Sequence, residues 1–156
     1  MMDKTPEEIA KEYFEQQFAD EDKRKKSIQD KLFIKLDAQV KKVTPELFAR
    51  FLDERGASRT CLSCGSNKLS VPETTTIQRD KLPENFSELS PEAQSKATEG
   101  ALVQYVSYSF IEDETMPRLS NVKYRVNCLN CGFISFYRAS PVVQWVMDQE
   151  EAGKDE

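Results

Sequence analysis

Hydrophobic residues recur at helical spacing through the first third of the chain. The segment 5–26 opens with Thr5, a good N-cap, and with Pro6, a residue favoured at the first helical position. Apolar residues four apart continue the pattern through 27–42, and a further helix is expected over 44–56. Each of these helices carries a thin apolar stripe. We therefore expect them to pack on one another, on the rest of the chain or on another molecule.

Alternating hydrophobic and polar residues predict β-strands in the second half of the chain. The strongest alternation lies in 101–111, and shorter strands are expected at 122–126 and 133–138. Segment 68–79 is rich in threonine and contains a proline, so it is expected to form a strand at a sheet edge. Residues 80–100 are polar and interrupted by turn signals, which indicates an insertion that includes a short helix.

Together these patterns predict an α+β fold, in which N-terminal helices are followed by an antiparallel β-sheet. A short C-terminal helix is expected to begin near Ser140. The predicted domain organisation is a helical segment over 1–57, a β domain over 58–147 that contains the insertion 80–100, and an acidic tail over 148–156.

All four cysteines lie in two copies of a C-x-x-C-G motif, Cys61–Gly65 and Cys128–Gly132. The glycine suits the left-handed backbone that such a turn requires. Two such pairs supply four thiolates, which fill the tetrahedral shell of a zinc ion and leave no open position for catalysis. The expected metal ligands are Cys61, Cys64, Cys128 and Cys131.

Other uses of the four cysteines are less consistent with the sequence. Disulfides need an oxidising compartment, and a thioredoxin-type pair normally stands alone near a βαβ pattern. An iron–sulfur cluster takes the same four ligands and remains an alternative. Over residues 59–140 the two knuckles resemble the zinc ribbon family, which implies a small β domain fixed by Zn²⁺. Sixty-three residues separate Cys64 from Cys128, and this spacing implies an insertion in the ribbon.

Charge and composition limit the range of functions. The net charge is −5, with 13 basic and 13 acidic residues in 1–60 but 9 basic and 14 acidic residues in 61–156, so the second part disfavours phosphate. The chain has no histidine and no glycine-rich phosphate loop, so we expect neither an enzyme nor a small-molecule substrate. No apolar run is long enough to span a bilayer, and the paired thiols without a leader predict a cytoplasmic protein.

The expected function is protein–protein recognition or self-association, as in a small bacterial or phage regulatory or adaptor protein. The residues predicted to make this contact form the helical stripes: Tyr13, Phe14, Phe18, Leu32 and Leu36. The alternative is that the ribbon sheet binds nucleic acid or the transcription machinery, using aromatic and basic residues of its last two strands. These residues are Tyr124, Arg125, Phe136 and Arg138, although residues in such strands more often form the core of a small sheet.

Two charged segments carry further hypotheses. The run Lys23–Lys26 follows Asp20–Asp22 and is either a solvated helix face or a contact for phosphate or an acidic partner. Loop 111–117 resembles the acidic hairpin of transcript-cleavage elongation factors, whose zinc ribbon carries an Asp-Glu pair into the polymerase active site. The matching residues would be Asp113 and Glu114, although a solvated acidic turn is the simpler explanation of them.

Overall fold

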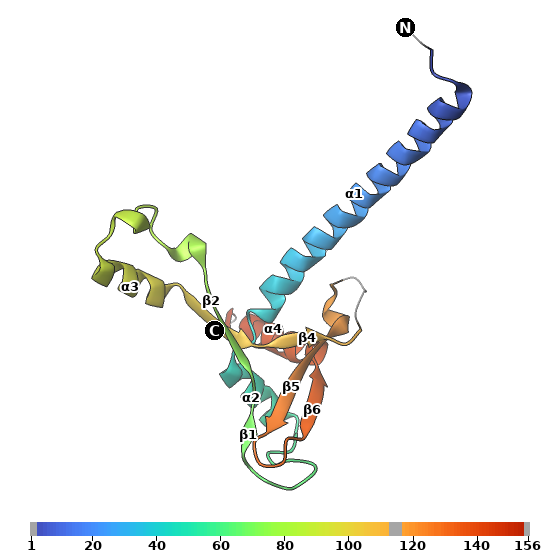
Figure 1. The fold of residues 1–156 in the computed structure, drawn as a ribbon. Helices are drawn as coiled ribbons and strands as arrows, with labels where there is room; N and C mark the ends of the chain where they lie inside the picture. The colour runs from blue at the N-terminus through green and yellow to red at the C-terminus, as the bar shows by residue number, and fades with distance from the viewer. Residues whose placement is uncertain (1–2, 113–116, 155–156) are drawn as a thin grey trace.

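The structure is a computed structural model that describes residues 3–112 and 117–154. It contains four α-helices within this part of the chain, and the α+β class is confirmed (Figure 1). The helices are α1 (Pro6–Val40), α2 (Pro45–Glu54), α3 (Pro91–Gly100) and α4 (Ala139–Lys154). The strands are β1 (Leu69–Ser70), β2 (Glu73–Ile77), β3 (Leu102–Val106), β4 (Tyr108–Phe110), β5 (Val122–Cys128) and β6 (Ile134–Arg138).

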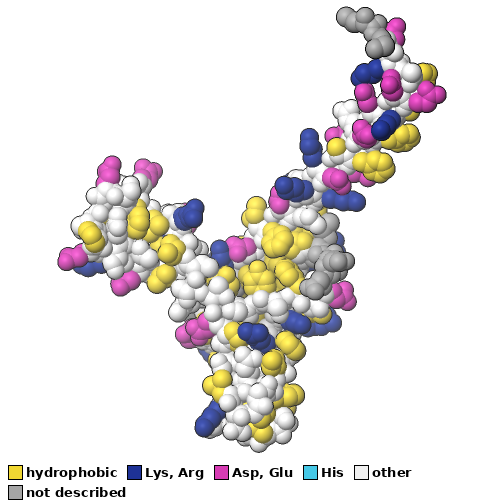
Figure 2. All heavy atoms as spheres, viewed as in Figure 1, with side chains coloured by type: hydrophobic (Ala, Val, Ile, Leu, Met, Phe, Trp, Pro, Cys, Tyr) yellow, Lys and Arg dark blue, Asp and Glu magenta, His cyan; other side chains and the backbone are white. Residues whose placement is uncertain are grey.

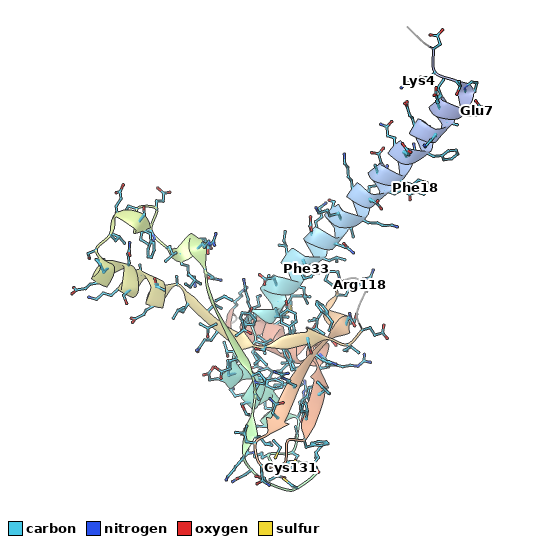
Figure 3. The ribbon with its side chains drawn as sticks, in the orientation of Figure 1. Lys4, Glu7, Phe18, Phe33, Arg118 and Cys131 are labelled. Atoms are coloured by element: carbon cyan, nitrogen blue, oxygen red, sulfur yellow. The ribbon has the colours of Figure 1, made fainter. Side chains whose placement is uncertain are left out.

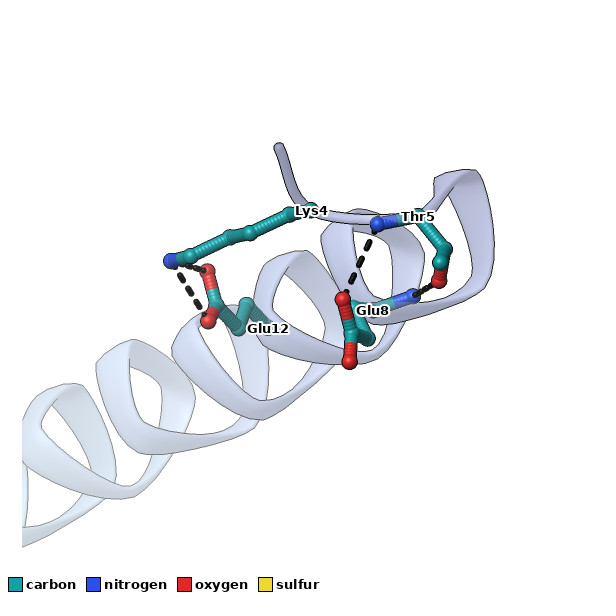
Figure 4. Close-up of polar contacts among 4 residues, drawn as sticks. All are labelled: Lys4, Thr5, Glu8 and Glu12. Atoms are coloured by element: carbon teal, nitrogen blue, oxygen red, sulfur yellow. Dashed lines mark hydrogen bonds and ion pairs between the residues drawn. The ribbon is translucent and has the colours of Figure 1, made fainter. Parts of the chain in front are cut away.

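The start of α1 follows the sequence signals closely. Thr5 Oγ1 accepts a hydrogen bond from the Glu8 N–H at 3.3 Å, and Glu8 Oε2 accepts one from the Thr5 N–H at 2.9 Å (Figure 4). This reciprocal pair is a capping box, which satisfies two N–H groups that the helix itself leaves unpaired. Lys4 Nζ donates to both carboxylate oxygens of Glu12 at 2.7 and 2.8 Å, one turn further along the helix.

Most of α1 projects away from the rest of the molecule (Figure 1). Every described residue from 3 to 31 is exposed to solvent, and burial begins only at Leu32. The last turns of the helix are anchored, because Leu36 and Val40 are fully buried. The helix is therefore held at one end only. A second projection, formed by β2, β3 and α3, diverges from the body in another direction.

Strand β5 is the centre of the main antiparallel sheet. β6 pairs with β5 along one side, from Lys123↔Arg138 to Asn127↔Ile134. On the other side β4 pairs with the first half of β5 and β1 with its last two residues. This confirms the expected antiparallel arrangement of the three strands near the second cysteine pair.

The strand expected over 101–111 is divided at Ser107 into β3 and β4, which belong to different sheets. The cause lies in the partners of Ser107. Its N–H donates to the Pro72 carbonyl at 2.9 Å, and its hydroxyl is 2.6 Å from Thr74 Oγ1. Pro72 likewise separates β1 from β2. The segment that joins β1 to β2 and the segment that joins β3 to β4 therefore leave the main sheet at the same point. Beyond it β2 and β3 pair only with each other and carry the inserted segment.

One hydrophobic core joins α2, α4, the base of α1 and the inner face of the main sheet. Phe48 of α2 packs against Tyr124 of β5 with ring centroids 5.3 Å apart, and Phe51 packs against Trp145 of α4. The core therefore crosses the boundary expected at residue 57. α4 is also longer than the short helix expected, because it continues through 148–154, where the sequence predicted a separate tail.

Tyr124 provides a test of this core. Its side chain is fully buried, and its hydroxyl has no hydrogen-bond partner among the described residues. Burial raises the pKa of this phenol above its usual value, so the hydroxyl stays protonated. Removing an unpaired buried hydroxyl relieves a desolvation cost of about 1–3 kcal/mol. We expect Tyr124→Phe to unfold at the same urea concentration as wild type or a higher one, whereas Tyr124→Ala should lose about 3–5 kcal/mol. A marked loss in Tyr124→Phe would contradict this assignment.

Candidate metal centre

The two C-x-x-C-G knuckles have the same backbone geometry. Gly65 and Gly132 have φ values of 76° and 83°, which is the left-handed conformation expected from the sequence. The N–H of Gly65 donates to the Cys61 carbonyl at 2.9 Å, and the N–H of Gly132 donates to the Cys128 carbonyl at 3.0 Å. Each turn therefore closes on its own first cysteine and points both thiols to the same side.

The four thiols converge at the far end of the body from α1; Figure 3 labels Cys131 there. The Sγ atoms of Cys61 and Cys131 are 3.7 Å apart, as are those of Cys64 and Cys128, and all four lie within 4.8 Å of one another. Bonded disulfide sulfurs would be about 2.05 Å apart. Four thiolates around one tetrahedral ion, with metal–sulfur bonds of about 2.3 Å, would be about 3.8 Å apart. The spacing therefore fits a single metal ion.

A multinuclear iron–sulfur cluster fits this spacing less well. Several iron ions and bridging sulfides would lie between the thiolates and would hold them further apart than one ion does. Within residues 3–112 and 117–154, these four cysteines are the one group of such ligands close enough together to hold a metal. Cys61 and Cys128 are buried, whereas Cys64 and Cys131 are exposed. The site therefore lies at the surface with one side against the body.

Hydrogen bonds make the four thiols unequal before a metal binds. The Asn130 side-chain amide donates to Cys64 Sγ at 3.4 Å, and with the Ser66 N–H it lowers the pKa of Cys64 to about 6. The N–H of Phe133 lowers the pKa of Cys131, but neighbouring thiols, Cys64 first, and burial outweigh it and raise that pKa to about 11. With these pKa values, the Cys64 thiolate and the protonated Cys131 thiol share the site at neutral pH. A cation that binds all four must displace the remaining protons.

A mainly apolar cavity of about 180 Å³ lies beside the metal centre. It is bordered by α2, by the segment that leads to the first knuckle, and by the inner face of β5 and β6. Cys61 and Cys128 form part of its wall, together with Phe48 and Phe133. The cavity separates the knuckles from the main core, so side-chain packing contributes less to cohesion at this end than around Tyr124.

The residues predicted to bind nucleic acid are only partly brought together. Arg125, Phe136 and Arg138 are exposed on the outer face of β5 and β6, where Arg125 pairs with Phe136. Tyr124 is different, because its side chain is fully buried under α2 and no base could stack on it. The sequence interpretation missed Lys123, whose Nζ lies 4.4 Å from the centre of the Phe136 ring. The strand alternation could have identified Lys123, since it lies on the same face as Arg125.

The residues predicted to contact a protein partner also divide into two groups. Tyr13, Phe14 and Phe18 are between 60% and 66% exposed on the free part of α1. Leu32 is half-buried, and Leu36 is 1% exposed because it packs into the core of its own chain. Leu36 is therefore an anchor of α1 and is not available to a partner. The two acidic residues compared with the transcript-cleavage factors, Asp113 and Glu114, lie outside the described residues.

Comparisons with protein-family models, with curated proteins and with solved structures found no match to this chain. The resemblance to the zinc ribbon family therefore rests on the two knuckles. No helix in the described part of the chain is both long enough and apolar enough to cross a membrane.

The geometry predicts one metal ion per chain. We expect Cys128→Ser to lower the metal content and to destabilise the second half of the chain, because one of the four thiolates is lost while binding a structural ion contributes roughly 10 kcal/mol or more. Elemental analysis and thermal unfolding measure the two effects. Ser63→Ala is the control, since it changes a side chain in the other knuckle but removes no ligand. A folded wild-type preparation without metal would contradict the prediction.

Proposed function

We propose that this chain is a non-enzymatic recognition protein, regulatory or adaptor in type, in which a structural Zn²⁺ fixes the body and α1 contacts another protein. The observation that carries this proposal is the complete exposure of residues 3–31 on a helix that bears aromatic side chains. Isolated helices gain little stability in water, and most protein helices depend on tertiary packing of an apolar face. The free part of α1 has no such packing within the described chain, so a second molecule is needed to provide it.

The exposed side chains of α1 support recognition by a protein surface. Phe14 and Phe18 are one turn apart, and Tyr13 contacts Phe14 edge-on with ring centroids 6.0 Å apart. Figure 3 labels Phe18 on the projecting part of the helix, well separated from the body. Aromatic side chains of this kind contribute much of the binding energy in protein interfaces. Burial of each ring would stabilise a complex by about 1.5–3 kcal/mol.

Zinc is the proposed metal because four thiolates suit it and fill its preferred tetrahedral shell. An ion with no open coordination position could not bind a substrate and act on it as a Lewis acid. Its proposed contribution is therefore structural. This is the reason to propose a function by contact rather than by catalysis. The cytoplasm suits such a site, because a reducing compartment keeps the thiols free to bind the metal.

A second candidate function is supported by the outer face of β5 and β6. Lys123, Arg125 and Arg138 surround the exposed ring of Phe136, which gives three cations and a stacking surface on adjacent strands. Residues 117–147 contain no acidic residue, so these cations have no carboxylate close by in the sequence. Such a face would suit single-stranded nucleic acid. It is small, however, and the overall charge of −5 opposes phosphate.

The first proposal predicts that the aromatic stripe is required for association. We expect immobilised wild type to capture a second copy of this chain or another protein. The immobilised double variant Phe14→Ser and Phe18→Ser should capture neither. Both residues are exposed, so the variant should keep its metal and its thermal unfolding temperature. Ile34→Ser is the matched control, because Ile34 is also exposed on α1 but lies on the opposite side of the helix. Identical binding by wild type and the double variant would contradict the proposal.

The second candidate is tested by titration of labelled single-stranded DNA and RNA, followed by fluorescence anisotropy. Because the basic face is small, we expect no nanomolar binding at about 150 mM salt. Nanomolar binding that is lost in Arg125→Glu and kept in Lys96→Glu, a basic residue of the inserted helix α3, would instead favour the nucleic-acid function.

A further inference from the structure

The charges of α1 are divided into two opposite halves. Residues 6–22 contain seven acidic residues and one basic residue, a net charge of −6. Residues 23–40 contain six basic and two acidic residues, a net charge of +4. In Figure 2 most Asp and Glu side chains of α1 lie toward its N-terminal end, and Lys and Arg side chains follow. The sign changes between Asp22 and Lys23, at the midpoint of Pro6–Val40.

Neither the helix dipole nor pairing within the chain explains this division. The dipole favours acidic residues in the first turn and basic residues in the last, and its effect fades within one turn of each end. The densest charges, Asp20–Asp22 and Lys23–Lys26, lie in the middle of the helix instead. Among the described residues, no charged side chain between Glu15 and Lys35 forms an ion pair. These charges are therefore available to another molecule.

A continuous seam runs along the same helix at alternating steps of four and three residues. Such steps keep residues on one face of a helix that pairs with another helix in a coiled coil. The outer positions of the seam are apolar, and the two central positions carry opposite charges. In chain order the six residues are Phe14, Phe18, Glu21, Lys25, Ile28 and Leu32.

The seam is complementary to itself when a second copy runs in the opposite direction. If two α1 helices overlap over their full length, Pro6 lies opposite Val40 and Lys23 lies at the centre. The seam residues then meet as apolar pairs on each side of a central layer of charge pairs. The opposed residues are Phe14 and Leu32, Phe18 and Ile28, and Glu21 and Lys25. A parallel arrangement would instead place Glu21 opposite Glu21 and Lys25 opposite Lys25.

The base of α1 provides room for the end of such a partner. A shallow hollow there is lined by Leu32, Lys35 and Gln39, which continue the seam, and by Arg118. The N-terminal end of an antiparallel partner would reach this hollow with an acidic first turn, which contains Glu7 and Glu8. Arg118 supplies positive charge where that turn would lie, whereas in this register Lys35 lies opposite Lys11 of the second copy. Leu36 and Val40 remain in the core of their own chain and are not needed for the contact.

We propose that α1 binds α1 of a second copy of this chain as an antiparallel helix pair centred on Lys23. This inference rests on the proposed function, for which it names the partner. By the two-fold symmetry of the pair, each contact occurs twice. The two bodies are then at opposite ends of a rod about 50 Å long, since 35 helical residues rise about 1.5 Å each.

Charge reversal at the centre of the seam tests both the contact and its direction. The full-length, zinc-loaded protein is studied by sedimentation equilibrium as wild type, Glu21→Lys, Lys25→Glu and the double swap. We expect wild type to dimerise and each single variant to dimerise at least about tenfold more weakly, because two attractive pairs become repulsive. The double swap should recover wild-type affinity to within about threefold, since the opposite charges again face each other. Lys23→Glu, the same charge change on the outer side of the same turn, should weaken the dimer less than Lys25→Glu.

Small-angle scattering of the dimer supplies the second measurement. We expect two separate maxima in the distance distribution, from the compact bodies at opposite ends of the rod. Bodies at the same end, or a double swap that does not recover, would overturn the antiparallel arrangement. A wild-type protein that stays monomeric at about 100 µM would overturn self-pairing altogether. If that monomer still needs Phe14 and Phe18 to bind a different protein, the proposed function stands and this inference alone fails; if it does not, both fail.

Discussion

Convergence of the two knuckles, which brings four thiols close enough together to hold one metal ion, is the constraint on which the body depends. Near the knuckles β1 contributes only two residues to the main sheet, Leu69 opposite Cys128 and Ser70 opposite Asn127. A two-residue strand is too short to hold its own position, and the cavity beside Cys61 removes part of the packing that could help it. A metal ion held by the four thiols would instead close a loop of 63 residues between Cys64 and Cys128. Metal–sulfur bonds would then offset the entropy cost of ordering that loop, which the hydrophobic core does not offset at this end.

A series of contacts through the hydrophobic core links the candidate metal centre to the base of α1. The second knuckle ends β5 at Cys128, and the inner face of β5 carries Tyr124 against α2. α2 in turn packs on α4, where the Trp145 indole N–H donates to the Glu54 carboxylate. The same core encloses the last turns of α1, and the N–H of Val106 donates to the Val43 carbonyl just beyond them. The direction in which α1 leaves the body is therefore fixed by contacts at its last two turns.

Local chemistry made part of this structure predictable. Caps, first-turn prolines and the glycines of the knuckles act within a few residues, so the sequence correctly identified the starts of α1, α2 and α3 and the four cysteines that lie close enough together to hold a metal ion. The division of 101–111 at Ser107 could not be predicted, because it depends on Pro72, which is distant in the sequence. The burial of Leu36 also escaped prediction, and the sequence left open whether Tyr124 belongs to the core or to an exposed surface. An apolar stripe has the same spacing whether it faces its own core or a partner, and only the packing of the other elements distinguishes the two cases.

Because most of α1 lies outside the core, its residue types are subject to different physical constraints from those of the body. A core position is constrained by the volume around it, so its residue type reflects stability. The residues before Leu32 are exposed and have no such constraint, and helix formation alone would favour alanine and interspersed charges of both signs. The helix instead carries clustered aromatic side chains, which lower helix propensity, and charges sorted into two blocks, which repel one another within each block. Both features cost stability in an isolated helix and would become favourable beside a partner of complementary shape and charge. These costs are the physical reason to propose the free part of α1 as a binding surface.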